Sequence, residues 1–206
     1  MQTESEHNWY ADLSTRFTDS DDPAFLYRGY DIAGASHDSV QTLIAYYRDD
    51  PTAAKIGVTP VSRGRHPYAN DFPASFVFHA LFAAFFAWVR EGKTPMHAPR
   101  ITLDESGCTI TDADGNALGG IRTPFTDLPT CVYHNDSRVG DGYDRLFGHI
   151  EVLEAEQLRR RYRDLPHYEK LVRENVRDCI AKGYLLAEDQ EEIVAQAVAN
   201  ARRRGL

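Results

Sequence analysis

The sequence predicts an α/β fold, and three of its features support this prediction. A strand-like stretch, residues 25–33, leads into a glycine turn and then into a helical pattern. An apolar helix is expected over 73–92, and the last third, 151–204, has helical periodicity. With 206 residues, of which 42% are hydrophobic, the chain is long enough for one real hydrophobic core. We expect one domain, with residues 1–150 as its core and 151–206 as a helical extension.

The amino-terminal part is expected to contain a loop, a strand and a helix. Residues 1–23 are polar and acidic, which is typical of a loop. In 25–33, FLYRGYDIA, aromatic residues and isoleucine alternate roughly with polar residues, which indicates a short strand. Gly34 ends this strand, and Ser36 or Asp38 is placed to cap a helix running through SVQTLIAYYRDD.

The middle of the chain predicts a long loop followed by a buried helix. Residues 49–72 contain three prolines and two glycines, which favours a loop. Pro73 suits the first position of the next helix, which we expect to end at Gly92. This helix is apolar nearly all round, which predicts burial on more than one side. Its apolar run, 75–89, is shorter than the ~20 residues that cross a bilayer, so no membrane association is expected.

Short β runs are expected after that helix, at 100–104 and 108–111, joined by tight turns. The next turn, DADGN at 112–116, imitates the opening of an EF-hand calcium loop. The imitation fails because Ala117 stands where the loop needs glycine and Thr123 where it needs a bidentate glutamate. We therefore expect a plain β-turn there.

The rest of the chain predicts one irregular segment and then helices. TPFTDLPT, 123–130, carries two prolines and is expected to be extended or irregular. A helix is expected over 153–165, and Pro166 opens a second helix that Gly183 ends. A third covers 187–204, with acids in its first turn and arginines in its last, as the helix dipole favours.

Composition argues against several classes of protein. The chain has 23 basic and 31 acidic residues, a net charge of −8, so we expect no nucleic-acid partner. Cys108, Cys131 and Cys179 lack the spacing of a zinc or redox motif, which predicts reduced thiols. The first 13 residues have no secretory character, so a cytoplasmic location is expected. No cofactor is expected.

Most of the histidines give no sign of a metal centre. His79 lies inside the apolar helix, where a single histidine is usually a hydrogen-bonded core residue. The others are expected in loops or near helix ends, none pairs at metal-ligand spacing, and no metal is therefore expected: these are His66, His97, His134, His149 and His167.

His37 differs from the other histidines in its position. It follows the predicted strand and the turn at 34–36, and an open α/β sheet places its reactive groups at the carboxyl ends of its strands. A histidine there can take a proton from a nucleophile and return it to a leaving group. It then needs a carboxylate to fix its tautomer and to stabilise the imidazolium.

Several long segments resemble one known family. YRGYDIAGASHDS (27–39) and GNALGGIRTPFTDLPT (115–130) are similar to the histidine segment and the "GNAxGGxR" signature of bacterial α/β-hydrolase-domain proteins. The apolar helix in 69–95 and the segment 167–197, with its GYLLAED, also resemble that group. The resemblance covers nearly the whole chain. It implies the carboxyl-terminal part of an α/β-hydrolase fold: the last strands with their helices, a short β-hairpin insertion and a carboxyl-terminal helical segment.

The resemblance also implies roles for individual residues. His37 matches the histidine of the catalytic triad, which follows the last strand of the fold. MQTESEHNW resembles the preceding strand and its acid loop, so Glu6 matches the acid, with Glu4 as the alternative. Arg122, in GGIR, is a candidate contact in the substrate pocket, and the competing interpretation is a structural arginine bonded to loop carbonyls.

The nucleophile is the important absence. No Gly-x-Ser-x-Gly occurs in the sequence, although the family order is serine, acid, histidine. The resemblance therefore implies part of a serine hydrolase for ester-type or related acyl bonds of small molecules, with the serine supplied by a second chain. Alternatives are an inactive remnant that binds a partner or has no function, and a protein that binds a small molecule without chemistry. A cut parallel sheet has unpaired edges, so we expect self-association or completion by another polypeptide.

Overall fold

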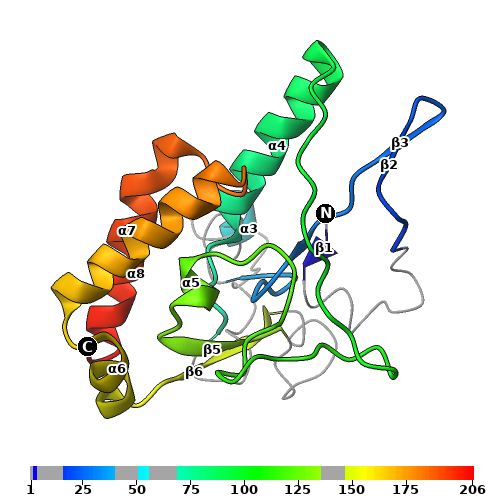
Figure 1. The fold of residues 1–206 in the computed structure, drawn as a ribbon. Coiled ribbons are helices and arrows are strands. Elements are labelled where there is room, and N and C mark those ends of the chain that lie inside the picture. The colour runs from blue at the N-terminus through cyan, green and yellow to red at the C-terminus, as the bar shows by residue number, and fades with distance from the viewer. Residues whose placement is uncertain (1, 4–15, 40–50, 56–68, 136–146) are drawn as a thin grey trace.

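The computed structural model describes residues 2–3, 16–39, 51–55, 69–135 and 147–206, and the structural statements below concern these residues (Figure 1). The strands are β1 Gln2–Thr3, β2 Ser20–Asp22, β3 Phe25–Tyr27, β4 Asp31–Ile32, β5 Cys131–His134 and β6 His149–Val152. The helices are α3 Pro51–Lys55, α4 Ala74–Glu91, α5 Pro124–Asp127, α6 Ala155–Tyr162, α7 Leu165–Ala181 and α8 Gln190–Arg203, with a 3-10 turn at Ala187–Asp189. The described chain is therefore mixed α/β, with small two-stranded sheets.

A short parallel ladder lies next to the site predicted from the sequence. β1 pairs with β4 in parallel. Ile121 adds a parallel bridge to Ile32, and its N–H donates to the carbonyl oxygen of Asp31 at 2.7 Å. The N–H of Ala33 donates back to the carbonyl oxygen of Ile121 at 3.1 Å. β4 thus has parallel neighbours on two sides, and the chain leaving it is held by the backbone of a distant segment.

The predicted strand 25–33 is divided into two strands. β3 pairs antiparallel with β2 as a hairpin, whereas β4 belongs to the parallel ladder. The loop expected over 1–23 is wrong at Gln2–Thr3, which forms β1, and at Ser20–Asp22, which forms β2. The Asp22 carboxylate accepts from the N–H of Ala24 at 2.9 Å, and this contact stabilises the reversal that lets a polar stretch pair with β3.

The next predicted elements are tested only at their edges. The helix expected after Ser36 or Asp38 falls mainly on residues 40–50, which lie outside the described residues. Within the loop expected over 49–72, α3 is a correction, since Pro51–Lys55 is helical. Pro51 begins that helix, where its fixed φ and missing N–H fit the first turn.

The ends of α4 confirm the sequence prediction, but its burial does not. Gly92 ends the helix in the left-handed conformation (φ +69°). Its first half packs in the core, whereas the second half extends away from the body of the molecule (Figure 1). There Phe82, Phe85, Phe86 and Val89 are 48–67% exposed, so burial on more than one side is wrong. Among the helices described, α4 is the one long and apolar enough to cross a membrane, judged by length and composition alone.

The region 100–118 contains the predicted turns without regular strands. The β runs expected at 100–104 and 108–111 are reduced to isolated antiparallel bridges. The turn at DADGN is confirmed, since the N–H of Gly115 donates to the carbonyl oxygen of Asp112 at 3.0 Å. The Asp112 side chain also accepts from two backbone N–H groups, so it serves the turn itself.

The irregular segment expected over 123–130 contains a short helix, α5, which corrects the prediction. The N–H of Thr123 donates to the Thr126 hydroxyl at 3.2 Å, which in turn donates to the carbonyl oxygen of Thr123 at 3.1 Å, and Pro124 occupies the first turn. A proline pair predicts irregular chain when read alone, but Pro124 at the start of a capped turn promotes helix.

The carboxyl-terminal helices agree with the sequence prediction. Asp164 caps α7 by accepting from the N–H of His167 at 2.8 Å, and Gly183 (φ +79°) follows its end. Arg204, after α8, is buried and donates to Thr130 at 2.8 Å and to both oxygens of Asp71 at 2.9 Å. One hydrophobic cluster includes residues from both β4 and α8, so the helices share the core with the strands.

Candidate functional site

His37 lies at the end of a tightly held loop that follows β4. Gly34 has φ +83°, and a Cβ there would come within 3.0 Å of Thr126 and 3.1 Å of Phe72. Asn70 donates from its side chain to the carbonyl oxygen of Gly34 at 3.0 Å. Residues 31–36 are buried and His37 is exposed. The packed turn therefore connects the parallel ladder to the surface, where the imidazole of His37 is exposed.

The carboxylate expected to orient His37 lies outside the described residues. Glu6 and Glu4 both fall in 4–15, so their distance from the imidazole is not tested. The pairing of His37 with Glu6, or with Glu4, stays a prediction.

Asp31 is a fully buried carboxylate in β4 that the sequence analysis did not single out. Arg16 Nη2 lies 2.7 Å from its Oδ2, and Arg100 Nη2 lies 2.8 Å from its Oδ1. The N–H of Ile101 also donates to Oδ2 at 3.0 Å. Two guanidinium groups and a backbone amide thus satisfy the charge, and Asp31 fixes β4 against the segment 98–101. An aspartate inside RGYDIA gives no local sign of this role.

Arg122 is engaged by protein groups on several sides. Its Nε donates to Asp127 and its Nη2 donates to Asp112, both at 2.7 Å. Further donors reach the carbonyl oxygens of Ala117 and Thr126. These contacts match the structural interpretation of Arg122 that the sequence left open. Its role as a substrate contact stays a prediction.

The glycines of GNALGGIR are required by close packing. Gly119 (φ +72°) would place a Cβ 2.2 Å from the carbonyl oxygen of Arg100, and Gly120 (φ +70°) would place one 2.8 Å from Ile101. Asn116 is buried and accepts from the N–H of Tyr133 at 3.0 Å. The backbone of GNALGGIR therefore passes close to residues 100–101, and this places Ile121 beside β4.

Two histidines expected in loops or near helix ends instead lie in paired strands, which corrects the prediction. His134 in β5 and His149 in β6 are direct cross-strand partners. Their rings are stacked, with centroids 4.3 Å apart and planes 11° from parallel. Glu151 lies on the same face, with Oε1 3.4 Å from His134 Nε2 and 3.9 Å from His149 Nε2. Only the strand register reveals this cluster, because the two histidines are 15 positions apart in the sequence.

The remaining histidines have separate surroundings. His79 is not a core residue, which corrects the prediction: its side chain is 52% exposed and bonds Asp189 at 2.9 Å. His97 contacts Asp19 at 2.7 Å, and His167 lies in the first turn of α7. His66 lies outside the described residues.

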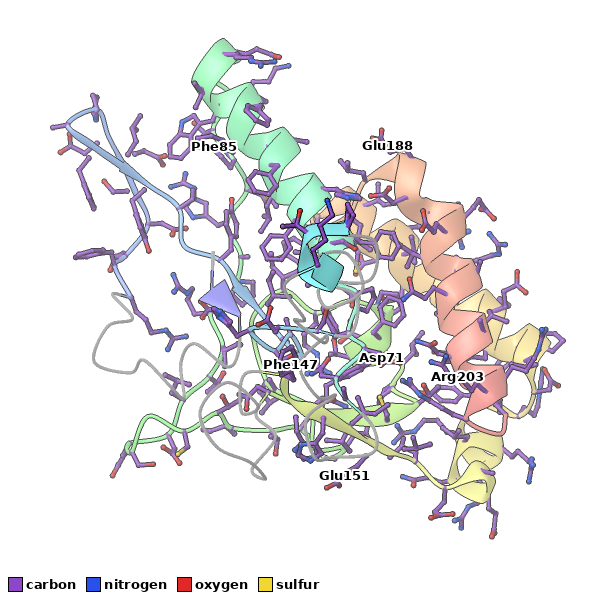
Figure 2. All side chains as sticks on the ribbon, turned by 180° about the vertical axis from the view of Figure 1, so that it is seen from behind. Asp71, Phe85, Phe147, Glu151, Glu188 and Arg203 are labelled. Atoms are coloured by element: carbon purple, nitrogen blue, oxygen red, sulfur yellow. The ribbon has the colours of Figure 1, made fainter. Side chains whose placement is uncertain are left out.

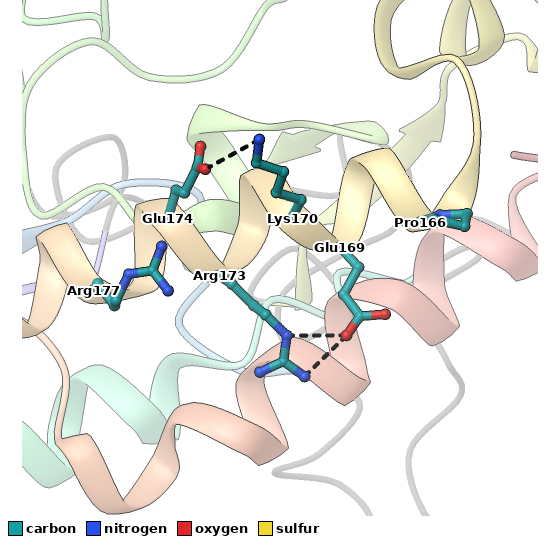
Figure 3. Close-up of a pocket in the computed structure, with 6 residues that line it drawn as sticks. All are labelled: Pro166, Glu169, Lys170, Arg173, Glu174 and Arg177. Carbon is teal, nitrogen blue, oxygen red and sulfur yellow. Dashed lines mark hydrogen bonds and ion pairs between the residues drawn. The ribbon is translucent and has the colours of Figure 1, made fainter.

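The two buried cysteines and the charged surface of α7 supply no further reactive group. No disulfide links the three cysteines, and burial raises the pKa of Cys131 and that of Cys179 to about 12, which keeps both thiols protonated. A hollow on α7 is lined by Pro166, Glu169, Lys170, Arg173, Glu174 and Arg177 (Figure 3). Its charges pair along the helix, with Arg173 2.9 Å from Glu169 and Lys170 3.9 Å from Glu174. This hollow is therefore an ordinary solvated helix face.

Comparison with known proteins establishes the class. The model of a family described as "alpha/beta hydrolase domain" matches residues 1–195, nearly the whole chain. The chain belongs to this α/β hydrolase domain family, which confirms the resemblance inferred from its segments. No curated protein and no solved structure matches the chain significantly.

Proposed function

We propose that this chain is the histidine-bearing part of a serine hydrolase for ester-type or related acyl bonds. His37 acts as general base and then as general acid, and Glu6, or alternatively Glu4, orients it. The serine and the oxyanion-binding amides come from a polypeptide segment outside this sequence, which contains no Gly-x-Ser-x-Gly. The chain contributes this half of the site without a cofactor.

One observation carries the proposal. In a chain whose family is an α/β hydrolase domain, the exposed imidazole of His37 follows a parallel-paired strand after the turn at residues 33–36. That is the position where this class of fold presents reactive groups. The turn before it is fixed by Gly34 and Asn70, so the imidazole leaves the body of the protein at a defined place.

The proposed chemistry follows from the properties of an imidazole beside a carboxylate. His37 takes the proton of the serine hydroxyl as the oxygen attacks the acyl carbon, and the carboxylate stabilises the imidazolium. The same proton passes to the leaving alcohol when the ester bond breaks. A water molecule then repeats the two transfers, which releases the acid and regenerates the serine.

The exposed half of α4 supports the proposal that a second polypeptide binds this chain. Phe82, Phe85, Phe86 and Val89 form an apolar face that is not covered by the described part of the chain. Figure 2 shows Phe85 on the part of α4 that projects from the molecule. A contiguous apolar surface is typical of a protein–protein contact. We propose that the segment carrying the nucleophile covers this face.

The test is an ester assay with and without the missing part. The purified chain is mixed with the product of a neighbouring reading frame that encodes Gly-x-Ser-x-Gly, and hydrolysis of a short-chain chromogenic ester is followed. We expect no turnover by the chain alone, and turnover by the mixture that falls at least ~100-fold with His37→Ala. His97→Ala removes an exposed histidine elsewhere and is the control. A mixture equally active with His37→Ala would contradict the proposal.

A binding module without catalysis is the second candidate, and the same apolar face of α4 favours it. In that case the assembled complex forms but hydrolyses no ester. Both functions predict an assembled complex in sedimentation, with or without His37→Ala. The ester assay of that complex separates them, since the hydrolase predicts turnover that His37→Ala abolishes and the binding module predicts no turnover in any variant.

A further inference from the structure

The side chains of His134, His149 and Glu151 share one face of the β5–β6 ribbon. His134 lies directly opposite His149, and Glu151 lies two residues further along β6. Successive side chains of a strand point to opposite faces, so this register places all three on the same side. The backbone pairing, rather than flexible loops, therefore sets their arrangement.

Two of the three distances among these residues suit a single small cation, and the stacked imidazoles need to rotate so that both nitrogen lone pairs point at one ion. One ligand atom from each residue can be chosen so that all lie within 4.8 Å of one another. In a tetrahedral zinc site with bonds of about 2.0–2.1 Å, neighbouring ligand atoms are about 3.3 Å apart. The His134–Glu151 separation of 3.4 Å already has this value, and the His149–Glu151 separation of 3.9 Å exceeds it only slightly.

The burial and the hydrogen bonding of these side chains also favour cation binding. The Nε2 atom of His134 is buried and makes no hydrogen bond to any residue the structure describes. The His149 side chain is buried as well, whereas Glu151 is 64% exposed. Figure 2 shows Glu151 at the edge of the molecule, far from Phe85 on α4. The nitrogen atoms thus lie inside, and the carboxylate faces the route by which a cation would enter.

We propose that His134, His149 and Glu151 bind one divalent first-row transition cation, with Zn²⁺ as the best fit. Two imidazole nitrogens and one carboxylate oxygen are preferred ligands of such ions, whereas calcium and magnesium select oxygen ligands. Three protein ligands leave one position of a tetrahedral site open to water or to another ligand.

The site is coupled to the loop that carries His37. Asn70 donates from one side-chain nitrogen to the carbonyl oxygens of both His134 (3.1 Å) and Gly34 (3.0 Å). A Cβ at Gly148 would lie 2.3 Å from the carbonyl oxygen of His134 and 3.0 Å from Ser36. The end of the ribbon and the loop after β4 are therefore packed together, and a bound cation would hold both in place.

The experiment titrates metal-stripped, tag-free full-length chain with Zn²⁺ by calorimetry and with Co²⁺ by visible absorption. We expect one ion per chain, with the absorption of a tetrahedral Co²⁺ centre. Glu151→Gln changes an exposed side chain and should weaken binding at least ~10-fold, as should His134→Gln. His97→Gln removes an exposed histidine outside the cluster and should leave the affinity unchanged.

Three results would overturn the proposal: no binding at ~100 µM metal, binding to Glu151→Gln and His134→Gln as tight as to the parent chain, or equal weakening by His97→Gln. The first result would leave the three residues as a simple ion-paired cluster. Circular dichroism of each variant confirms that folding is retained. Ester hydrolysis is not part of this measurement, so the metal site and the proposed function are tested independently.

Discussion

Gly119 shows how the space for a single atom, a Cβ, restricts the residue type in the GNALGGIR segment. Its backbone lies so close to Arg100 that no side chain fits, and its positive φ disfavours any other residue. Gly107 shares the positive φ (+84°), but a Cβ there would meet nothing within 4 Å. A substitution at Gly107 therefore meets backbone strain alone, whereas one at Gly119 meets both strain and a steric clash.

Gly119→Ala is expected to lower the free energy of unfolding by about 3 kcal/mol or more, because strain and a backbone clash add. Gly107→Ala is expected to cost only about 1 kcal/mol, since strain alone acts. Urea denaturation of both variants measures the difference. Equal losses would show that the segment moves aside to accept the added methyl group.

Asp31 is the residue on which the position of β4 depends. Asp31→Asn should destabilise the chain by about 3 kcal/mol, because Arg16 and Arg100 lose the negative charge that compensates them in a buried setting. Asp178→Asn breaks an exposed pair with Lys182 and is expected to cost under about 1 kcal/mol. Thermal unfolding of the two variants tests this. A loss for Asp31→Asn as small as that for Asp178→Asn would contradict the structural role.

At the scale of elements, α4 contains two different halves. Its first turns are anchored in the core by Phe76, Val77, Ala80 and Leu81, whereas its last turns carry exposed phenylalanines. A uniformly apolar helix predicts burial all round only where neighbouring elements extend as far as the helix does. Here the neighbouring elements end sooner (Figure 1).

Phe85→Ser combined with Phe86→Ser is expected to weaken self-association of the isolated chain at least ~10-fold, because both rings expose apolar surface on α4. Light scattering over a range of concentrations measures the change. Ile110→Ser alters an exposed apolar residue outside α4 and should have no effect. A parent chain that is a clean, cooperatively unfolding monomer would contradict the predicted self-association through α4.

Ribbon β5–β6 illustrates the limit of sequence analysis at this scale. Each strand has four residues, and neither carries a turn signal or a long alternating pattern. The helices over 153–204 were predictable because local periodicity and their Pro and Gly boundaries define them. Strand pairing is a non-local event, so the cluster of His134, His149 and Glu151 was not predictable.

At the scale of the whole molecule, the buried acids predict how stability depends on pH. Burial raises the pKa of Cys131, Cys179 and Tyr162 to about 12, above their ordinary values of 9.0 for the thiols and 10.0 for the phenol. The unfolded chain therefore loses these protons first. Their stabilising contribution is complete below pH 9 and is lost as the pH rises toward 12.

We expect the free energy of unfolding to fall by several kcal/mol between pH 9 and pH 12, since a pKa difference of one corresponds to about 1.4 kcal/mol. Urea denaturation at a series of pH values measures this. Cys179→Ala removes one of the buried acids and should make the decline shallower. A stability that is constant from pH 8.5 to pH 11 would contradict the burial of these groups.

By itself, the sequence determined the helices of the carboxyl-terminal third, the turns at Gly107 and Gly115, and the family, because each depends on local pattern or on recognisable segments. The tertiary structure decided the rest. It paired β4 with Ile121, surrounded Asp31 with two arginines, left the end of α4 uncovered and placed His134 against His149. These features arise between residues far apart in the chain, and a local pattern contains no information about which distant segment a residue will meet.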